Sequence, residues 1–237
     1  MESGKRRHID ARPSRIVFVF GKNGRALEDA PAVLRHDKLI VLAAVQQYGN
    51  ALKHASSELQ TDPEIVIAAV TQYGSALQYA TRFLRGDENI VLAAVTPSVG
   101  AFAAQDGRAF QYATAKLRSN RNLVLAAAKR NGWVLKSAPD TLRNDRKVVK
   151  TAVMQDGRVL QYASRNLRGA YDIVLAAVTQ NGRALRCASE EMRSHREIVC
   201  TAVAQNAKAL QYATPETRES LATESVVKRD RRIAELE

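Results

Sequence analysis

Hydrophobic and polar positions recur along the chain with a period of 25 residues. Runs of six mostly apolar residues, IVLAAV in the fullest form, begin eight copies between Arg15 and Ala222, and the fourth copy carries an insertion of eight residues. The copies agree in chemistry at fixed offsets, as in IVLAAVQQYGNALKHASSELQTDPE from Ile40 and IVLAAVTQNGRALRCASEEMRSHRE from Ile173. Self-similarity at such a period is typical of a solenoid of stacked repeats.

The apolar run of each repeat predicts an α-helix that is buried on every side, with an Ala pair that allows close packing. Residues that favour a helix N-cap precede the run: Asp37, Asp62, Asp87, Asn120 and Asp145. Glycines that suit a left-handed, helix-closing residue follow it: Gly24, Gly49, Gly74, Gly107, Gly132, Gly157 and Gly182. We expect a helix of about 11 residues, roughly 16 Å long.

The second half of each repeat is shorter and amphipathic. A Leu or Phe is followed three positions later by Ala and then by Ser, Thr or Pro, as in Leu52, Ala55 and Ser56. The spacing of three residues indicates a helical face that points toward the core, and the Ser, Thr or Pro after it can cap a further helical turn. The alternation typical of a strand is not found. The predicted fold class is therefore all-α: an α-solenoid of eight 25-residue units, each one α-helix plus a short helical or 3₁₀ segment.

The pattern divides the chain into three parts. Residues 1–14 form a basic extension, residues 15–222 form a single solenoid with one continuous core, and residues 223–237 form a charged tail. The first and last copies depart most from the pattern, as terminal caps of repeat proteins do. The insertion at 96–103, TPSVGAFA, is either a surface loop or an error in a predicted gene.

Two strings of the chain resemble a known family. NGRALRCASEEMRSHREIVCTAV and YGSALQYATRFLRGDENIVLAAV are similar to the repeats of a family catalogued as domain of unknown function four-one-one-six, over residues 15–222. The resemblance implies a helical repeat protein and brings no established activity, ligand or catalytic residue. The alternation of one helix with a very short one is also similar to leucine-rich variant repeats, which suggests a curved superhelix.

The composition gives the chain a basic net charge and indicates which cellular compartments are compatible with it. Of 237 residues, 36 are Lys or Arg and 24 are Asp or Glu, so the formal net charge is +12. No apolar run approaches the ~20 residues that span a membrane, and no signal-peptide pattern opens the chain. Two cysteines, Cys187 and Cys200, are too few for a disulfide scaffold, and in apolar helical patterns they behave as small hydrophobes. We expect an intracellular monomer that is not inserted in a membrane.

The sequence offers no reaction machinery. The histidines, His8, His36, His54 and His195, fall at unrelated repeat positions without metal-ligand spacing to the cysteines. No phosphate-binding loop or hydrolase motif occurs, and the insertion that breaks the repeat lacks ionisable side chains. We therefore expect a protein that is not an enzyme and that holds neither a cofactor nor a metal.

The candidate binding stripe consists of basic residues at two repeat positions, together with Trp133. The first position carries Arg in seven repeats and Gln60 in the other: Arg35, Arg85, Arg118, Arg143, Arg168, Arg193 and Arg218. The second position, just after the glycine, adds Arg25, Arg108, Arg158, Arg183 and Lys208. Such a stripe can follow a phosphate backbone, with bases stacked on Tyr79, Tyr112, Tyr162 and Tyr212.

Each of these features also has a structural interpretation. An arginine at every repeat can neutralise helix-terminal carbonyls, and a recurring tyrosine can be half-buried packing. Gln47, Gln72, Gln105, Gln155, Gln180 and Gln205 can satisfy helix ends. Trp133 either anchors a partner or packs against the insertion.

Two functions remain open on the sequence. The first hypothesis is a non-catalytic scaffold for protein–protein interaction, because helical repeats offer long faces for an unidentified protein partner. The second is binding of RNA or another polyanion through the stripe and the basic ends at residues 5–7 and 228–232.

Overall fold

The computed structural model describes residues 13–96 and 107–223 of the chain. The basic ends and all of the insertion except Thr96 therefore lie outside the described residues. The chain divides between Ala113 and Thr114 into two compact units, each of which is considered by itself. Every regular element in the described part of the chain is a helix, as the sequence predicts, and none of these helices is long and apolar enough to cross a membrane.

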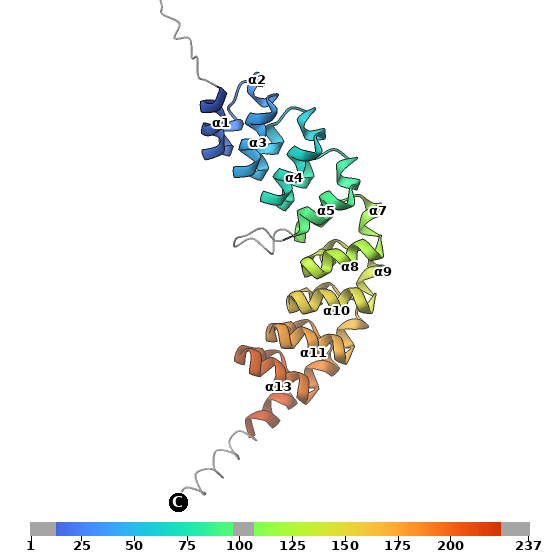
Figure 1. The fold of residues 1–237 in the computed structure, drawn as a ribbon. Coiled ribbons are helices and arrows are strands. Elements are labelled where there is room, and N and C mark those ends of the chain that lie inside the picture. Colours follow the sequence, from blue (N-terminus) through green and yellow to red (C-terminus); the bar gives the residue numbers. More distant parts are fainter. Residues whose placement is uncertain (1–12, 97–106, 224–237) are drawn as a thin grey trace, which may run out of the picture. The chain divides into compact units, whose positions relative to one another are not determined.

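The first unit begins at α1. With η denoting a 3₁₀-helix, its elements are α1 (Pro13–Lys22), η1 (Gly24–Leu27), α2 (Ala32–Arg35), α3 (Lys38–Gln47), η2 (Gly49–His54), η3 (Leu59–Thr61), α4 (Pro63–Gln72), η4 (Gly74–Tyr79), η5 (Leu84–Gly86), α5 (Glu88–Val95) and η6 (Gly107–Tyr112). The long α-helices pack in chain order, α1 on α3, α3 on α4 and α4 on α5 (Figure 1).

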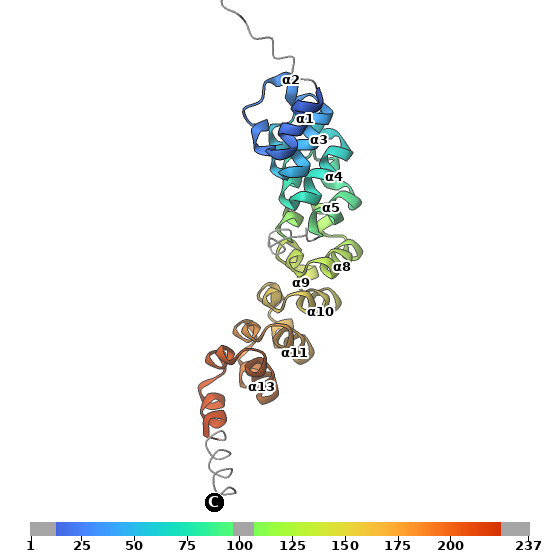
Figure 2. The ribbon, with the colours of Figure 1, turned by 60° about the vertical axis from the view of Figure 1, so that its left-hand side comes forward.

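The second unit repeats this order. Its elements are α7 (Ala115–Arg118), α8 (Arg121–Arg130), η7 (Gly132–Ser137), α9 (Asp140–Arg143), α10 (Arg146–Gln155), η8 (Gly157–Tyr162), η9 (Leu167–Gly169), α11 (Tyr171–Gln180), η10 (Gly182–Cys187), α12 (Glu190–Ser194), α13 (Arg196–Gln205) and η11 (Ala207–Tyr212). The long α-helices stack on one another and the six-residue 3₁₀-helices do the same, which makes two columns (Figure 2). The prediction of stacked helical repeats is confirmed.

The core lies between the two columns. The first, second, fifth and sixth positions of the apolar run are buried, as for Ile65, Val66, Ala69 and Val70. The third position points outward, and Ile67 is 42% exposed. The expectation of a helix buried on every side is therefore wrong, because a two-layer stack leaves one face of each α-helix in contact with solvent.

The α-helices begin as the sequence predicts. The carboxylate of Asp62 accepts the backbone N–H groups of Glu64 and Ile65, and the side chains of Asp37, Asp87, Asn120 and Asp145 cap their own helices in the same way. Two of these carboxylates also pair with the preceding repeat: Nζ of Lys38 lies 2.8 Å from Asp62, and Nε of Arg121 lies 2.6 Å from Asp145. Asp62 and Asp145 thus both start their own helices and contact the preceding repeat.

The repeated glycines do not close the α-helices. Each α-helix ends on an extended residue such as Asp156, and the glycine after it opens the 3₁₀-helix without a left-handed φ. A Cβ at Gly157 would collide with the backbone carbonyl of Ala177 in the next repeat, and Gly24, Gly49, Gly74, Gly132 and Gly182 face a carbonyl in the same way. The glycines are thus needed for close approach between repeats, and Ala207, which replaces glycine in the last repeat, is exposed.

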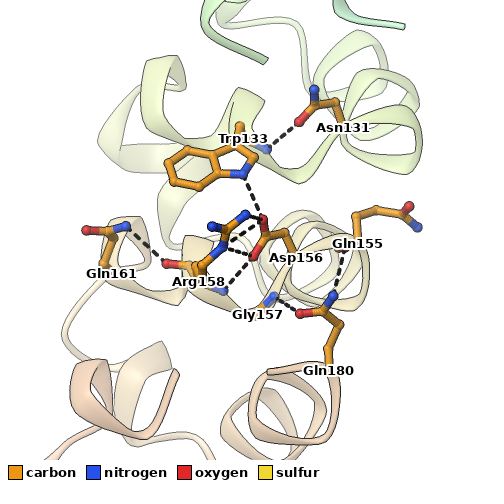
Figure 3. A network of polar contacts seen from close by, with 8 residues as sticks. All are labelled: Asn131, Trp133, Gln155, Asp156, Gly157, Arg158, Gln161 and Gln180. Carbon is orange, nitrogen blue, oxygen red and sulfur yellow. Dashed lines mark hydrogen bonds and ion pairs between the residues drawn. The ribbon is translucent and has the colours of Figure 1, made fainter. Parts of the chain in front are cut away.

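The glutamine row joins the repeats at the same place. Oε1 of Gln180 accepts the N–H of Gly157 at 2.6 Å, and Oε1 of Gln205 accepts the N–H of Gly182 at 2.6 Å. Nε2 of Gln180 donates to the carbonyl of Gln155, at the end of α10 (Figure 3). The structural interpretation of this row is therefore correct, and the glutamines bridge successive repeats.

Candidate functional site

The first arginine position of the predicted stripe lies at the end of the short helix that closes each repeat. Arg35, Arg85, Arg118, Arg143, Arg168 and Arg193 are half-buried and Arg218 is exposed. Nη2 of Arg143 donates to the carbonyl of Lys136 at 2.7 Å. At the same repeat position Nε2 of Gln60 lies 3.4 Å from the carbonyl of Lys53, the equivalent of Lys136, and 3.1 Å from that of Leu52. Both side chains satisfy terminal carbonyls of the 3₁₀-helix in their own repeat.

The main chain of this row also links repeats. The carbonyl of Arg143 accepts the N–H of Ser164 at 3.0 Å, and the carbonyl of Arg168 accepts the N–H of Ser189 at 2.9 Å. For Arg143 these contacts, together with the bond to Lys136, favour the structural interpretation. Nε is buried without a hydrogen-bond partner in Arg35, Arg85, Arg118, Arg143, Arg168 and Arg193. We name the members of this row the capping arginines: Arg35, Arg85, Arg118, Arg143, Arg168, Arg193 and Arg218.

Substitution of Arg143 tests this interpretation. Because Gln60 makes the same contact, Arg143→Gln should leave the free energy of unfolding within about 0.5 kcal/mol of wild type. Arg143→Ala should lower it by about 1 kcal/mol, since the carbonyl of Lys136 loses its donor. Urea denaturation followed by circular dichroism measures both changes, and equal losses in the two variants would contradict the capping role.

The second basic position lies at the other end of the 3₁₀-helices and is exposed. Asp156 and Asn181 accept the backbone N–H groups of Arg158 at 2.9 Å and Arg183 at 3.1 Å. Asn206 holds Lys208 in the same way. The exposed row therefore lies at the start of the 3₁₀-helices, whereas Arg143 and Arg168 lie on the short helices that close their repeats, α9 and η9. That the two rows form one binding stripe stays a prediction.

The exposed row continues into a wider basic surface on the second unit. The outward residues of η7, η8, η10 and η11 make what we name the 3₁₀ face: Trp133, Lys136, Arg158, Gln161, Tyr162, Arg183, Arg186, Cys187, Lys208, Gln211 and Tyr212. Five of these side chains are Lys or Arg, and none of the four helices contains Asp or Glu. The helices pack side by side, so the surface is continuous across repeats.

Trp133 is held on the 3₁₀ face by the following repeat. Its indole Nε1 donates to Oδ2 of Asp156 at 2.8 Å, and its ring meets that of Tyr162 edge-on at 6.0 Å between centroids. The Arg158 guanidinium lies 5.4 Å from the centroid of the indole, which is within range of a cation–π contact (Figure 3). The alternative of packing against the insertion lies outside the described residues.

Asp156 organises this cluster through its charge. Its carboxylate accepts Trp133 Nε1 and forms an ion pair with Arg158 at 2.6 Å. Burial alone would raise the pKa of Asp156, but the hydrogen bonds from Arg158 and Trp133 outweigh it and hold the pKa below its ordinary value. The carboxylate therefore stays ionised at neutral pH and neutralises Arg158 locally.

A pocket of about 230 Å³ opens beside this cluster. It lies between successive repeats and is lined by Trp133, Arg158, Gln161, Arg183, Ala184, Arg186, Cys187 and Tyr212. The lining includes three guanidinium groups and two aromatic rings, and it contains no carboxylate. Such a pocket can accept an anion with a flat group attached.

The corresponding face of the first unit carries fewer charges. Arg25 and Arg108 are exposed, and Arg25 lies 4.9 Å from the centroid of the Tyr48 ring. Asn50 and Ser75 occupy the same position in the two repeats between them. Tyr79 and Tyr112 are half-buried, as packing predicts. Lys53 is also exposed there, so the described 3₁₀-helices η1, η2, η4 and η6 of the first unit carry three Lys or Arg side chains, against five on the 3₁₀ face.

Comparison with known proteins places the chain in a family. The family model described as Domain of unknown function (DUF4116) matches residues 18–60, 62–118, 103–141, 120–168 and 171–218. The chain belongs to this family. A search of curated proteins found no match, and a search of solved structures found none either. The predicted resemblance is confirmed.

In this DUF4116 member the sequence pattern missed several residues in and beside the pocket. Gln161, Arg186 and Cys187 of the lining, and Asp156, which accepts a hydrogen bond from Trp133, were not among the predicted binding residues. The signal available for Asp156 is an Asx residue two positions before the exposed basic one, also seen at Asn181 and Asn206. Arg186 gives no such signal, because only stacking of η8 on η10 brings it beside Trp133 and Arg158.

The thiols and acidic groups give no metal site in the described parts of this DUF4116 chain. No three His, Cys, Asp or Glu side chains of residues 13–96 and 107–223 gather to hold a metal ion. Both cysteines are free, Cys187 is half-buried and Cys200 is exposed. Cys200 is exposed although it lies in an apolar pattern, because it occupies the outward third position of the apolar run on α13.

Proposed function

We propose that the chain is a non-catalytic repeat protein that binds RNA or a similar polyanion on the 3₁₀ face of its second unit. One observation carries the proposal: four stacked 3₁₀-helices present five Lys or Arg side chains and contain no Asp or Glu, and one of the five, Arg158, pairs with Asp156 beside them. Clustering of cations along one face is the electrostatic footprint of nucleic-acid binding. The net charge of +12 supports it by attracting polyanions over longer distances.

The aromatic side chains on this face favour RNA over a polyanion without bases. Trp133, Tyr162 and Tyr212 lie among the exposed cations, each half-buried with part of its ring accessible. Proteins that bind single strands combine basic grooves with aromatic rings on which bases stack. The proposed contact uses the exposed basic position, whereas Arg143 of the capping arginines donates to the carbonyl of Lys136 in its own repeat.

Binding of a protein partner is the second candidate function, and a different surface of the second unit supports it. An open groove of about 510 Å³ lies on the α-helical column and includes Met154, Tyr171 and Leu175 in its lining. Met154 is 61% exposed and Tyr171 is 37% exposed, and apolar side chains gathered in one exposed groove are typical of a surface that binds a partner. Scaffold function on this groove would be independent of RNA binding on the 3₁₀ face.

Two charge-matched double variants test the proposed function. Arg183→Gln with Arg186→Gln should weaken binding of a fluorescently labelled single-stranded RNA about tenfold or more at 50 mM salt. The slope of log affinity against log salt should become shallower by about 1.4, since two phosphate contacts are lost. Fluorescence anisotropy between 50 and 200 mM salt measures both quantities.

The control pair removes the same charge from the other column. Lys129→Gln with Lys147→Gln lowers the net charge by two on α8 and α10, and both residues are exposed. Binding by this variant should stay within about twofold of wild type. Equal losses in the two variants would show attraction by net charge alone and would contradict a site on the 3₁₀ face.

A further inference from the structure

We infer that the pocket between Trp133 and Tyr212 holds one nucleotide of a single-stranded RNA, with its phosphate on Arg183 and Arg186 and its base on an aromatic ring. The inference rests on the proposed function and specifies where on the 3₁₀ face the strand is read. Its evidence is the size, the charge and the aromatic lining of the pocket.

The size of the pocket suits one unit of a polymer. Pockets for whole small molecules usually enclose about 300–1,000 Å³, and this one encloses about 230 Å³. It lies between η8 and η10, whose outward residues continue onto the neighbouring helices of the 3₁₀ face. A chain molecule can therefore place one unit in the pocket and continue along the same face.

The charge of the pocket suits a phosphate. Arg158 forms an ion pair with Asp156 at 2.6 Å, so it brings hydrogen-bond donors to the pocket but little net charge. Arg183 and Arg186 come from the next repeat and bring two positive charges to a lining without carboxylates. Guanidinium groups bind phosphate oxygens through paired N–H donors.

The aromatic lining suits a base. The hydrogen bond to Asp156 and the edge contact with Tyr162 fix the orientation of Trp133 before any ligand arrives. A ring held in place loses little conformational entropy when a base stacks on it. The amide of Gln161, in the same lining, can both donate to and accept from a base edge.

The first test uses Trp133 as its own reporter, because it is the only tryptophan of the chain. Titration of the wild-type protein with oligouridylate at 50 mM salt should quench the indole emission as the base stacks. Inorganic polyphosphate, which has no bases, should bind with little quenching. Equal quenching by both polymers would overturn the stacking of a base on Trp133.

The second test compares the two thiols, which are the only cysteines of the chain. Cys187 lines the pocket, whereas Cys200 lies on α13 in the other column. Bound oligouridylate should slow the alkylation of Cys187 by iodoacetamide at least fivefold, measured by peptide mass spectrometry. The alkylation rate of Cys200 should not change, which makes it an internal control in the same molecule.

The outcomes separate this inference from the proposed function. RNA binding in the anisotropy assay without a change at Trp133 and Cys187 would overturn the pocket and leave the 3₁₀ face as the site. Absence of RNA binding at 50 mM salt would overturn both. Poly-glutamate that binds as tightly as oligouridylate and protects Cys187 equally would overturn the RNA assignment in favour of an acidic protein.

A substitution gives an independent readout of affinity. Trp133→Ala should weaken oligouridylate binding about tenfold, the range of one lost base stack. Binding of polyphosphate should change less than twofold, which shows that the variant keeps its charge and fold. Equal losses for both polymers would overturn the stacking role.

Discussion

Gly157→Ala is expected to lower the free energy of unfolding of the second unit by about 3 kcal/mol. The added Cβ would meet the backbone carbonyl of Ala177, and it would lie 3.2 Å from Oε1 of Gln180. A backbone atom cannot turn away as a side chain does, so the repeats must separate and both layers lose packing. Overpacking of this kind usually costs about 1–3 kcal/mol, and loss of the Gly157–Gln180 hydrogen bond adds to it.

The matched control for this variant is Gly169→Ala, in the same unit. A Cβ there would lie 3.3 Å from Oγ of Ser189, a side-chain atom that can move, and His36, Thr61 and Ser119 occupy the position in other repeats. Its free energy of unfolding should stay within about 0.5 kcal/mol of wild type. Urea denaturation followed by Trp133 emission and circular dichroism measures both variants, and a stable Gly157→Ala protein would disprove the close-approach argument.

Phe110→Ala is expected to destabilise the first unit by about 3–5 kcal/mol, the usual cost of removing a buried Phe. Phe110 is fully buried on η6, which packs against α5 and η4. The other repeats carry Leu at this position, so the phenyl ring fills a larger space than elsewhere in the chain. Truncation leaves a cavity that the two neighbouring elements cannot both close.

Phe110→Leu separates the loss of volume from the need for an aromatic ring. Because Leu fits the position in seven repeats, this variant should cost less than about 1.5 kcal/mol. Urea denaturation followed by circular dichroism at 222 nm measures both variants. A loss from Phe110→Leu as large as that from Phe110→Ala would indicate a specific aromatic contact.

The repeat pattern predicted most of the fold. Asp62 and Asp145 cap helices where the spacing indicated, and Leu77 and Leu160 are fully buried in the 3₁₀ column. These features depend on residues within one repeat, so local sequence contains the information. The prediction failed for the glycines, because their role depends on a carbonyl that the next repeat places beside them. It failed for Ile67, because the exposure of that side chain depends on how the two layers pack.

The candidate site was predicted only in part. Arg158, Arg183, Lys208 and Trp133 were singled out, and the structure places them on one exposed face. The capping arginines were grouped with them because a charged residue at a repeated position does not reveal whether its side chain is half-buried or exposed. Asp156 and Arg186 were missed, since their contacts with Trp133 and with the pocket are made between repeats.

The sequence by itself determined the helical repeat, its caps, its inward face and the family to which the chain belongs. These properties follow from hydrophobic spacing and capping preferences within about 25 residues. Only the tertiary structure decided which basic side chains lie half-buried and which are exposed on the 3₁₀ face. The reason is that a side chain 23 or more residues away, such as Gln180 on Gly157 or Asp145 on Arg121, reaches its partner only when the repeats stack.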